Sequence, residues 1–377
     1  MARGYSQGDL ARAAGVTRQA ISGIESARWS PSLVVGLSLA RALDTTVEEL
    51  FGEASEPPSV SARLAVRTSR QGGTTPRRVL LSDVAGDTIA FPLSRDRSFV
   101  PGFVPALGMV RAAEETPIGA EDAGLALETN QALPAAKRSR NDHGSVRAIR
   151  IAGTAPTLAV AGCDPALALL QGPLARHRPP LELAWWQCGN AMALELLESG
   201  AVHAAAVHRG VATRTRSRPG VAAVGFASWR EGLALAPRHR GNVRDLRDVV
   251  SRGLRIANRE RGSEARRLVD DQLDRLGLAS SDVAGYETVC TAHLLVASAV
   301  GSGLADAAVT TEPAALAFGL EFVSWQEEIS ELHIPRALMG STEVRALLDV
   351  LGGRELPRQL TTLEGYGAEV CGRILVA

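Results

Sequence analysis

The chain has 377 residues, too many for one ordinary domain, so two or three domains are expected. Its 45% hydrophobic and 22% charged residues are typical of a soluble globular protein. No apolar run approaches the ~20 residues that span a bilayer, which argues against a membrane protein. The start of the sequence shows no signal-peptide core, so a cytoplasmic location is expected. The formal net charge of zero neither supports nor excludes a local cluster of cations for DNA.

The number and spacing of the cysteines narrow the class of protein further. The four cysteines are spread along the chain without a CxxC pair, which argues against a disulfide framework and against structural zinc. No metal site is therefore predicted. The cysteines are Cys163, Cys188, Cys290 and Cys371.

Short helices with clear ends fill residues 1–52. Ser6 begins a capping box, and Gly15 predicts the end of the helix that follows it. Thr17 is expected to cap a second helix. Ser30-Pro31 predicts the start of a third, with proline at the first helical position.

A helix, a turn with glycine and a second helix form the unit that lays its second helix in the major groove of DNA. Arg18 and Gln19, near the start of the second helix, are expected to face base edges. Gln7, at the start of the first helix, is placed to position a phosphate. The complete set of expected DNA contacts is Gln7, Thr17, Arg18, Gln19, Ser22 and Arg28. By spacing alone, a small helical dimerisation module with solvated side chains is the alternative.

The run SQGDLARAAGVTRQAISGIESARWSPSLVVGLSLARALDTTVEELF resembles phage repressors and Xre-type helix-turn-helix regulators along its full length. The resemblance implies an all-α DNA-binding domain over residues 1–52, with a double-stranded DNA operator as partner. A homodimer is expected, because a single DNA-binding domain binds weakly and the symmetry of an operator matches that of a dimer.

The middle of the chain changes character twice. Residues 53–76 are rich in Ser, Pro, Gly and Thr and are interpreted as a mobile linker. Residues 77–134 predict a small β module that opens with a hairpin turning at Gly86-Asp87. Residues 135–147 contain the basic run Lys137-Arg138-Ser139-Arg140 and are interpreted as a second linker, with contact to DNA phosphates as the alternative.

From residue 148 to 377, strand and helix patterns alternate, which predicts an α/β domain with parallel strands. Several strands lead through polar loops with Gly or Ser into helix N-termini, a geometry that suits an anion or carboxylate. Arg259 and Arg261 stand beside Gly262-Ser263 in one such loop. They add guanidinium charge next to a hydroxyl and a bare backbone.

Three stretches, AGCDPALALL, NRERGSEARRLVDDQL and AGYETVCTAHLLVASAVGSGLADAAVT, resemble the type II periplasmic-binding-protein fold, in the branch related to molybdate-binding proteins. The resemblance implies two lobes joined by a double hinge, with the ligand between them. The chain is expected to leave the first lobe near residues 208–226 and to return near 311–323. The expected ligand-binding residues are Cys163, Asp164, Gly189, Asn190, Arg259, Arg261, Gly262, Ser263, Thr291, His293 and, on the hinge side, Glu312.

A small anionic effector of the molybdate or tungstate type is the leading expectation for this pocket. An amino-acid-like or cofactor-like ligand stays open, because Asp164 and Glu312 would repel a doubly charged oxyanion. Three cysteines, Cys163, Cys188 and Cys290, fall at predicted pocket loops. They are either small buried fillers or part of a soft-ligand or redox-responsive site.

These features favour a ligand-responsive DNA-binding regulator that carries no resident cofactor. Two alternatives stay open: a regulator whose binding-protein-like domain serves only dimerisation, and an enzyme acting on a small anionic substrate. The chain has no HExxH, GxSxG or P-loop motif and no GxGxxG after a strand, so no catalytic residue is assigned and an enzyme is disfavoured. The seven histidines are scattered and are interpreted as mostly surface or hinge residues.

Overall fold

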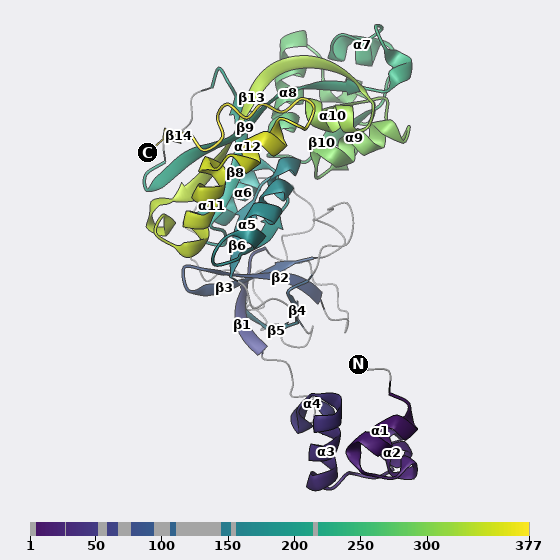
Figure 1. Ribbon diagram of the computed structural model, residues 1–377. Coiled ribbons are helices and arrows are strands. Elements are labelled where there is room, and N and C mark those ends of the chain that lie inside the picture. The colour runs from purple at the N-terminus through teal and green to yellow at the C-terminus, as the bar shows by residue number, and fades with distance from the viewer. Residues whose placement is uncertain are drawn as a thin grey trace, which may run out of the picture. The chain divides into compact units, whose positions relative to one another are not determined.

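The computed structural model describes residues 5–26, 28–51, 59–66, 77–93, 106–110, 145–151, 156–213 and 218–376 (Figure 1). The chain divides into two compact units, Met1–Pro58 and Ser59–Ala377. Within the described ranges, no helix combines the length and the apolar character needed to cross a membrane.

The described part of the first unit contains α1 (Gln7–Ala14), α2 (Arg18–Glu25), α3 (Leu33–Leu43) and α4 (Val47–Phe51). The local signals for α1 and α2 are confirmed: Ser6 forms the capping box of α1, and Thr17 caps α2. Gly15 ends α1 in the left-handed region at φ 68°, where a side chain would be strained. The buried core of this unit consists of Ala11, Ala14, Ile21 and Leu39.

The start of α3 differs from the prediction. Ser32, not Ser30, is the N-cap residue, and its hydroxyl accepts a hydrogen bond from the amide of Val35 at 3.4 Å. The reason is geometric, because an N-cap side chain reaches the amide three residues ahead. Pro31 therefore precedes the cap instead of occupying the first helical position.

The second unit begins with a small closed barrel in the order β1-β3-β2-β4-β5. Its strands are β1 (Ser59–Leu64), β2 (Arg77–Val84), β3 (Asp87–Pro92), β4 (Gly108–Val110) and β5 (Ser145–Arg150). The predicted hairpin is confirmed, since β2 and β3 pair antiparallel, but its turn lies one residue earlier than the predicted Gly86-Asp87. Ala85 and Gly86 form its turn, both at positive φ as tight two-residue hairpin turns require.

The barrel extends beyond the boundaries expected from composition. β1 lies inside residues 53–76, and β5 begins inside 135–147 and runs past residue 148, where the binding domain was expected to begin. These two strands are short and partly polar, and they pair with each other, Ser59 opposite Ile149. A partner so distant in sequence leaves no local signal. The basic run at residues 137–140 lies outside the described residues.

The barrel shares a hydrophobic core with the region that follows it. The rings of Phe91 and Trp186 lie 5.7 Å apart, centroid to centroid. The Ser82 hydroxyl donates to the carbonyl of Thr157 at 3.1 Å, and the Thr157 hydroxyl donates back to the carbonyl of Leu81 at 3.2 Å. The barrel is thus joined to its neighbour by both apolar packing and buried hydrogen bonds.

That neighbour is lobe 1 of a two-lobed α/β region. Lobe 1 contains β6 (Thr157–Ala161), η3 (Pro165–Leu170), α5 (Gln171–Arg176), β7 (Glu182–Trp186), α6 (Asn190–Glu198), β8 (Ala204–Gly210), η6 (Arg336–Leu338), α11 (Thr342–Gly352), α12 (Glu355–Leu360) and β14 (Ile374–Val376). Lobe 2 contains η4 (Pro237–His239), α7 (Leu246–Ser251), β10 (Ile256–Arg259), α8 (Glu264–Leu276), η5 (Ser280–Asp282), β11 (Val289–Cys290), α9 (His293–Gly301), β12 (Ala307–Thr311) and α10 (Glu312–Ala317). Figure 1 shows the two lobes joined by two long strands.

The connecting strands are β9 (Val221–Leu235) and β13 (Glu321–Pro335), which pair antiparallel along their whole length. They link the sheets of both lobes into one, in the order β11-β10-β12-β9-β13-β8-β6-β7, with β14 on β9. β12 pairs with β9 at residues 231–235, whereas β8 pairs with β13 at residues 328–333. The parallel pairs β6–β7, β6–β8, β10–β11 and β10–β12 lie on either side of this crossing.

The crossing lies further along the chain than expected on both strands. The outward crossing falls near Trp229 to Gly232, beyond 208–226, and the return falls near Gln326, beyond 311–323. Gly232 lets β9 pair closely with β13 at the crossing, because a Cβ there would lie 2.1 Å from the carbonyl oxygen of Val323. Only glycine lets the two backbones approach this closely.

Candidate functional site

A group of fully buried polar side chains lies where the two lobes meet the crossing strands. We call it the interlobe cluster. It consists of Cys163, Asp164, His208, Glu231, Arg259, His293 and Glu328. Buried polar groups are costly unless they are paired or bind something, so their partners need to be traced one by one.

The fold brings these residues together from distant positions. Cys163 and Asp164 follow β6, and His208 lies near the carboxyl end of β8, all in lobe 1. Arg259 ends β10 and His293 begins α9, both in lobe 2. The carboxyl ends of neighbouring parallel strands meet at one edge of a sheet, which is where α/β proteins form their ligand sites.

Two carboxyl groups reach the cluster from the crossing strands, Glu231 from β9 and Glu328 from β13. Glu328 forms an ion pair with Nδ1 of His208. Burial lowers the pKa of His208, but the Glu328 carboxylate outweighs it, so the pKa is raised well above its usual value. Burial alone would raise the pKa of Glu328, but the charge of His208 outweighs burial and lowers this pKa, so the carboxylate form is favoured.

Glu231 has a different environment. Its oxygens lie 3.6 Å from Nδ1 of His208 and 4.0 Å from Nδ1 of His293, and neither oxygen accepts a hydrogen bond from the described residues. Burial, followed by the negative charge of Glu328, raises the pKa of Glu231 well above its usual value. This side chain therefore favours the protonated form.

His293 joins the two lobes. Its Nε2 lies 3.6 Å from Sγ of Cys163, and its Nδ1 lies 3.2 Å from the hydroxyl of Thr310. Burial and the positive charges of Arg259 and His208 lower the pKa of His293 well below its usual value. The imidazole is therefore neutral.

Arg259 is the cation of lobe 2 in the cluster. Its Nε and Nη2 donate to both oxygens of Glu260, at 2.8 and 2.9 Å. Its Nη1 is buried and has no partner among the described residues. A guanidinium with one free donor aimed into a closed interior can bind an acceptor atom of a ligand.

Asp164 connects the cluster to the C-terminal segment. Its Oδ1 accepts hydrogen bonds from the amide of Ala166 at 2.9 Å and from the hydroxyl of Tyr366 at 2.8 Å. Burial raises the pKa of Asp164 despite these bonds. The hydrogen bonds orient the carboxyl group, which also caps η3.

The structure places the predicted ligand-binding residues in three groups. Cys163, Asp164, Arg259 and His293 lie in the interlobe cluster. Gly189, Asn190, Gly262 and Ser263 lie at the contact between α6 and the loop before α8, where the amide of Ala191 donates to the carbonyl of Gly262 at 3.3 Å. Arg261 is exposed, Thr291 is half-buried, and Glu312 forms a surface-side ion pair with Arg230.

Two of the second group have defined local roles. Asn190 donates to the carbonyl of His208 at 2.7 Å and accepts from its amide at 3.2 Å, so it fixes the backbone beside the cluster. Ser263 caps α8. Arg259 therefore brings to the cluster the charge that the sequence pattern assigned equally to Arg259 and Arg261.

Sequence reasoning missed three members of the cluster, His208, Glu231 and Glu328. The interpretation of most histidines as surface or hinge residues is wrong, because four of the six described histidines are buried. They are His203, His208, His293 and His333, which are 2%, 3%, 0% and 4% exposed. A carboxylate in a mostly apolar strand, whose one other charge is Arg230, was the available signal for Glu231. The sequence signal for Glu328 was weaker, because its strand carries several other charged residues.

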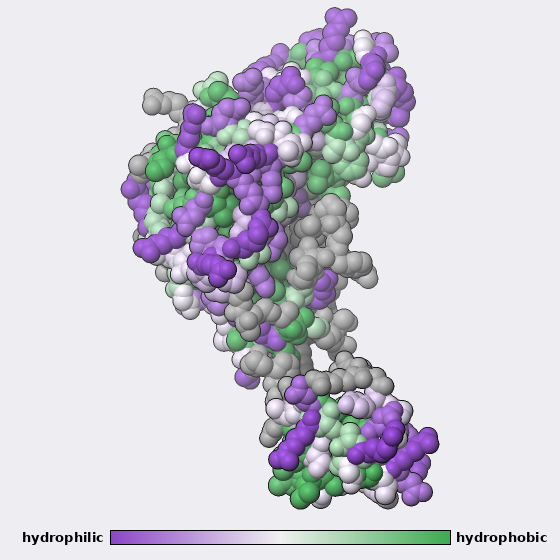
Figure 2. Space-filling view, in the orientation of Figure 1, coloured by the Kyte–Doolittle hydropathy of each residue, from purple (hydrophilic) through white to green (hydrophobic). Residues whose placement is uncertain are grey.

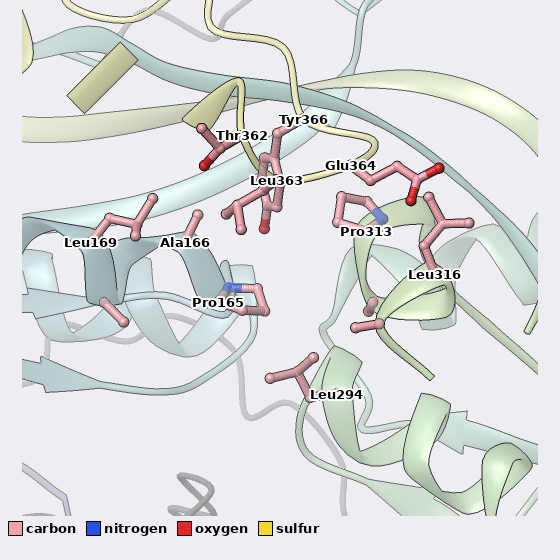
Figure 3. Close-up of a pocket in the computed structure, with 13 residues that line it drawn as sticks. Pro165, Ala166, Leu169, Leu294, Pro313, Leu316, Thr362, Leu363, Glu364 and Tyr366 are labelled. Carbon is pink, nitrogen blue, oxygen red and sulfur yellow. The ribbon is translucent and has the colours of Figure 1, made fainter. Parts of the chain in front are cut away.

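An apolar pocket of about 470 Å³ lies beside the cluster instead of containing it (Figure 3). Its lining consists of Pro165, Ala166, Ala168, Leu169, Leu294, Pro313, Ala314, Leu316, Ala317, Thr362, Leu363, Glu364 and Tyr366. Figure 3 shows lobe 1 forming one wall, lobe 2 the opposite wall and the C-terminal segment closing a third side. Tyr366 links the two spaces, since it lines the pocket and donates to Asp164.

In the first unit, the side chains expected to contact DNA lie in and around α2. Arg18, Gln19, Ser22 and Arg28 are exposed. Thr17 is engaged as the N-cap, accepting from the amide of Ala20 at 3.1 Å. Gln7 donates from Nε2 to Glu25 at 2.7 Å, so it joins α1 to α2.

Known proteins match both parts of the chain. A helix-turn-helix family matches residues 1–50, and a family described as PBP superfamily domain matches residues 171–352. The HTH-type transcriptional regulator YgzD of Bacillus subtilis (strain 168) is 40% identical over 48 residues, 13% of this chain and 73% of YgzD. An HTH-type transcriptional regulator of Methanothermobacter thermautotrophicus is 45% identical over 49 residues, 13% of this chain and 71% of that protein.

The larger unit has relatives of its own. YvgK of Bacillus subtilis (strain 168), an uncharacterized protein, is 30% identical over 147 residues, 39% of this chain. The chain spans only 47% of the length of YvgK. Among solved structures, the regulatory domain of MetR, a LysR family regulator from N. meningitidis, aligns with a TM-score of 0.41 at 13% identity, covering 56% of this chain and 97% of that domain.

The helical first unit, the two-lobed second unit and both family matches agree. The chain belongs to the Xre-type helix-turn-helix transcriptional regulators, and carries behind its DNA-binding unit an α/β domain of the periplasmic-binding-protein superfamily.

Proposed function

We propose that the protein is a ligand-responsive transcription regulator of the cytoplasm, which binds operator DNA through α2 and a small effector between its two lobes. The observation that carries this proposal is a set of buried polar atoms in the interlobe cluster that have no hydrogen-bond partner among the residues that the structure describes. They include Nε2 of His208 and Nη1 of Arg259. Each unpaired buried group costs about 1–3 kcal/mol, and a ligand that paired them would recover part of that cost.

The charges of the cluster bear on the class of effector. Nη1 of Arg259 favours an anion, which keeps molybdate or tungstate as a candidate. Asp164 and Glu328 oppose a doubly charged oxyanion. An effector with an apolar body would also fill the neighbouring pocket, so organic carboxylates belong in the same screen.

Control of DNA binding would act through the relative placement of the lobes. Lobe 1 shares its core with the barrel, and only residues 52–58 separate β1 of the barrel from α4 of the DNA-binding unit. A ligand that binds the closed lobes more tightly than the open lobes shifts the population toward closure. Closure would then change the surface that the barrel and the connected DNA-binding unit offer to a partner subunit.

A homodimer forms part of this proposal. In α3, Leu33 and Val34 are 70% and 73% exposed, and Figure 2 shows hydrophobic surface over this helix. Exposed apolar patches commonly mark contact surfaces. Two heads held together would bind a symmetric operator far more tightly than one.

One observation favours the enzyme alternative. The thiol of Cys163 lies 3.6 Å from an imidazole nitrogen of His293, and paired thiol and imidazole groups serve as nucleophile and base in several enzyme classes. Both groups are buried, so this reading also requires the lobes to open. Covalent labelling of Cys163 by a substrate, detected by mass spectrometry, would support it.

The proposal is tested in two steps with the full-length protein. Operator sequences are first selected from random DNA. Operator affinity and melting temperature are then measured with molybdate, tungstate, sulfate, phosphate and small carboxylates. A saturable rise in melting temperature accompanied by a change in operator affinity is expected.

Arg259→Gln should abolish the response to an anionic effector, and Arg275→Gln, on the exposed side of α8, should leave it intact. A stabilising compound that never alters operator affinity would contradict control by the lobes. A chain that selects no DNA sequence would contradict the regulator itself. If no compound raises the melting temperature, the alternative in which the binding-protein-like domain serves only dimerisation is favoured.

A further inference from the structure

We infer that the interlobe cluster binds a divalent transition-metal ion, with Zn²⁺ as the reference case, through Sγ of Cys163, Nε2 of His208 and Nε2 of His293. The three side chains offer donor atoms that all lie within 4.8 Å of one another. All three are buried. A thiolate with two imidazoles is a donor set that zinc and related ions prefer.

The spacing of one donor pair fits a shared ion. Zinc bonds of about 2.3 Å to sulfur and about 2.0–2.1 Å to nitrogen, at a tetrahedral angle, separate the two donor atoms by about 3.6 Å. The distance from Sγ of Cys163 to Nε2 of His293 is 3.6 Å. The pair is therefore already placed for coordination.

The orientation of His293 leaves the correct nitrogen available. The hydroxyl of Thr310 donates its hydrogen to the carbonyl of His293, at 3.2 Å. That hydroxyl can then only accept from Nδ1 of His293, also at 3.2 Å. The proton thus resides on Nδ1, and Nε2 presents a lone pair toward Cys163.

His208 has a similar second partner, and its Nε2 becomes a donor once it gives up its proton to the incoming ion. Its Nδ1 bonds to the carboxylate of Glu328, and its Nε2 is buried without a partner among the described residues. A carboxylate that accepts from the far nitrogen of a histidine is the usual second partner of a metal-binding imidazole. Gln326 donates to the other oxygen of Glu328 at 2.5 Å, which orients the carboxylate in turn.

The ion would bridge the lobes. Cys163 and His208 belong to lobe 1 and His293 to lobe 2, so coordination would hold the lobes closed. Three protein ligands leave a fourth position for water or for a donor atom of a second ligand. This inference rests on the proposed function in one respect, that closure of the lobes alters DNA binding.

Sequence spacing could not have revealed this site, because the ligands are far apart in the chain and form no compact motif. The nearby residues Cys188 and Cys290 do not complete a CxxC pair with Cys163. The three donors meet only after β6, β8 and α9 have assembled around the crossing strands.

The test uses Co²⁺ as the probe. Full-length protein is reduced, freed of metal with a chelator and titrated with Co²⁺ without oxygen. We expect one Co²⁺ per chain, with the thiolate-to-cobalt charge-transfer absorption and the intense visible bands of tetrahedral cobalt. Added Zn²⁺ should remove both signals by displacement.

Cys163→Ser should lose the charge-transfer absorption, whereas Cys371→Ser should keep it, because the Cys371 thiol contacts the carbonyl of Leu351 outside the cluster. Should Cys163→Ser fail to fold by circular dichroism, Thr310→Val supplies a second test. It removes both hydrogen bonds that the Thr310 hydroxyl makes with His293 and leaves the three donor side chains in place. We expect Co²⁺ affinity to fall about 10–100-fold with the absorption still visible at saturation. No charge-transfer absorption in the unaltered protein, or equal absorption in folded Cys163→Ser, would overturn the site.

Operator affinity measured on the same samples, with and without Zn²⁺, separates the two proposals. Cobalt bound through Cys163 with no change in operator affinity would support the site and contradict control by closure. An operator response to an organic or oxyanion effector, without any cobalt signal, would overturn the metal site and leave the proposed regulator standing.

Discussion

The DNA-binding unit and the two-lobed unit use polar side chains in opposite ways. In the first, Arg18 and Gln19 lie exposed on one short helix, within a single continuous segment. In the second, residues from Cys163 to Glu328 gather from distant strands into an interior that is closed to solvent. A surface helix can meet DNA without changing shape, whereas an enclosed site has to open before a ligand enters. Under the proposed function, the lobes would move and the helix would recognise DNA as a rigid element.

The largest expected effect tests whether the two units are independent. Phe226 is 0% exposed in the core of lobe 1, so Phe226→Ala should lower the free energy of unfolding of the second unit by about 3–5 kcal/mol. Thermal unfolding followed by circular dichroism should show this transition shift while that of Met1–Pro58 stays unchanged. Phe318→Ala, at a side chain 40% exposed, is the control and should cost far less. An equal shift in both transitions would contradict the independence of the units.

The next effect concerns recognition by α2. Arg18→Ala and Gln19→Ala should each reduce discrimination between the operator and a base-substituted operator by about 1–3 kcal/mol. Competition binding with the two DNA sequences measures the difference. Arg12→Ala, on α1 and paired with Asp9, is the control that should leave discrimination unchanged. A uniform loss of affinity for all sequences would reassign both side chains to phosphate contact.

An effect of intermediate size is the pH dependence that a buried histidine gives to the stability of the second unit. Burial lowers the pKa of His203 to about 4, and its Nδ1 accepts from the amide of Ala159 at 3.0 Å. The unfolded state therefore binds the proton first as pH falls below about 6.5, so stability decreases on acidification. The contribution of His203 should fall by about 2 kcal/mol between pH 7.5 and pH 5. His203→Asn keeps an acceptor but cannot titrate, and an unchanged pH dependence in this variant would contradict the assignment.

The smallest effect belongs to the cap of α2. Thr17→Ala should destabilise the first unit by about 1 kcal/mol, because the amide of Ala20 loses its acceptor. Thr17→Ser retains a hydroxyl and should restore most of that stability. Thermal unfolding of the first transition measures both variants, and equal melting temperatures for Ala and Ser would show that the cap contributes nothing.

Local signals predicted the first unit well, since each helix end depends on residues only a few positions apart. Ser6, Gly15 and Thr17 all act as their patterns indicate, and only the start of α3 moved, to Ser32. β1 of the barrel remained hidden because its pairing partner lies far along the chain.

The candidate site was predictable only in part. Resemblance pointed to the loops that carry Cys163 and His293, because those loops lead directly into helix N-termini. His208, Glu231 and Glu328 lie within long strands, where their inward direction depends on the register between β8, β9 and β13. A shift of one residue would turn these side chains to the other face. Only the assembled sheet specifies that they meet.

Closure of the lobes as the control of DNA binding is the central claim, and it can be tested without knowing the effector. A Cβ built on Gly189 of lobe 1 would lie 3.3 Å from Cβ of Ser263 in lobe 2, slightly under the range of about 3.5–4.5 Å found in disulfides. It would also lie 2.9 Å from Oε1 of Glu260, so that flexible side chain has to shift. We would measure operator affinity of the full-length Gly189→Cys, Ser263→Cys variant oxidised and reduced, with Gly189→Cys alone as control. The account predicts that oxidation, confirmed by mass spectrometry, changes operator affinity at least about fivefold in the double variant only. Equal affinity of the oxidised and reduced double variant would contradict it.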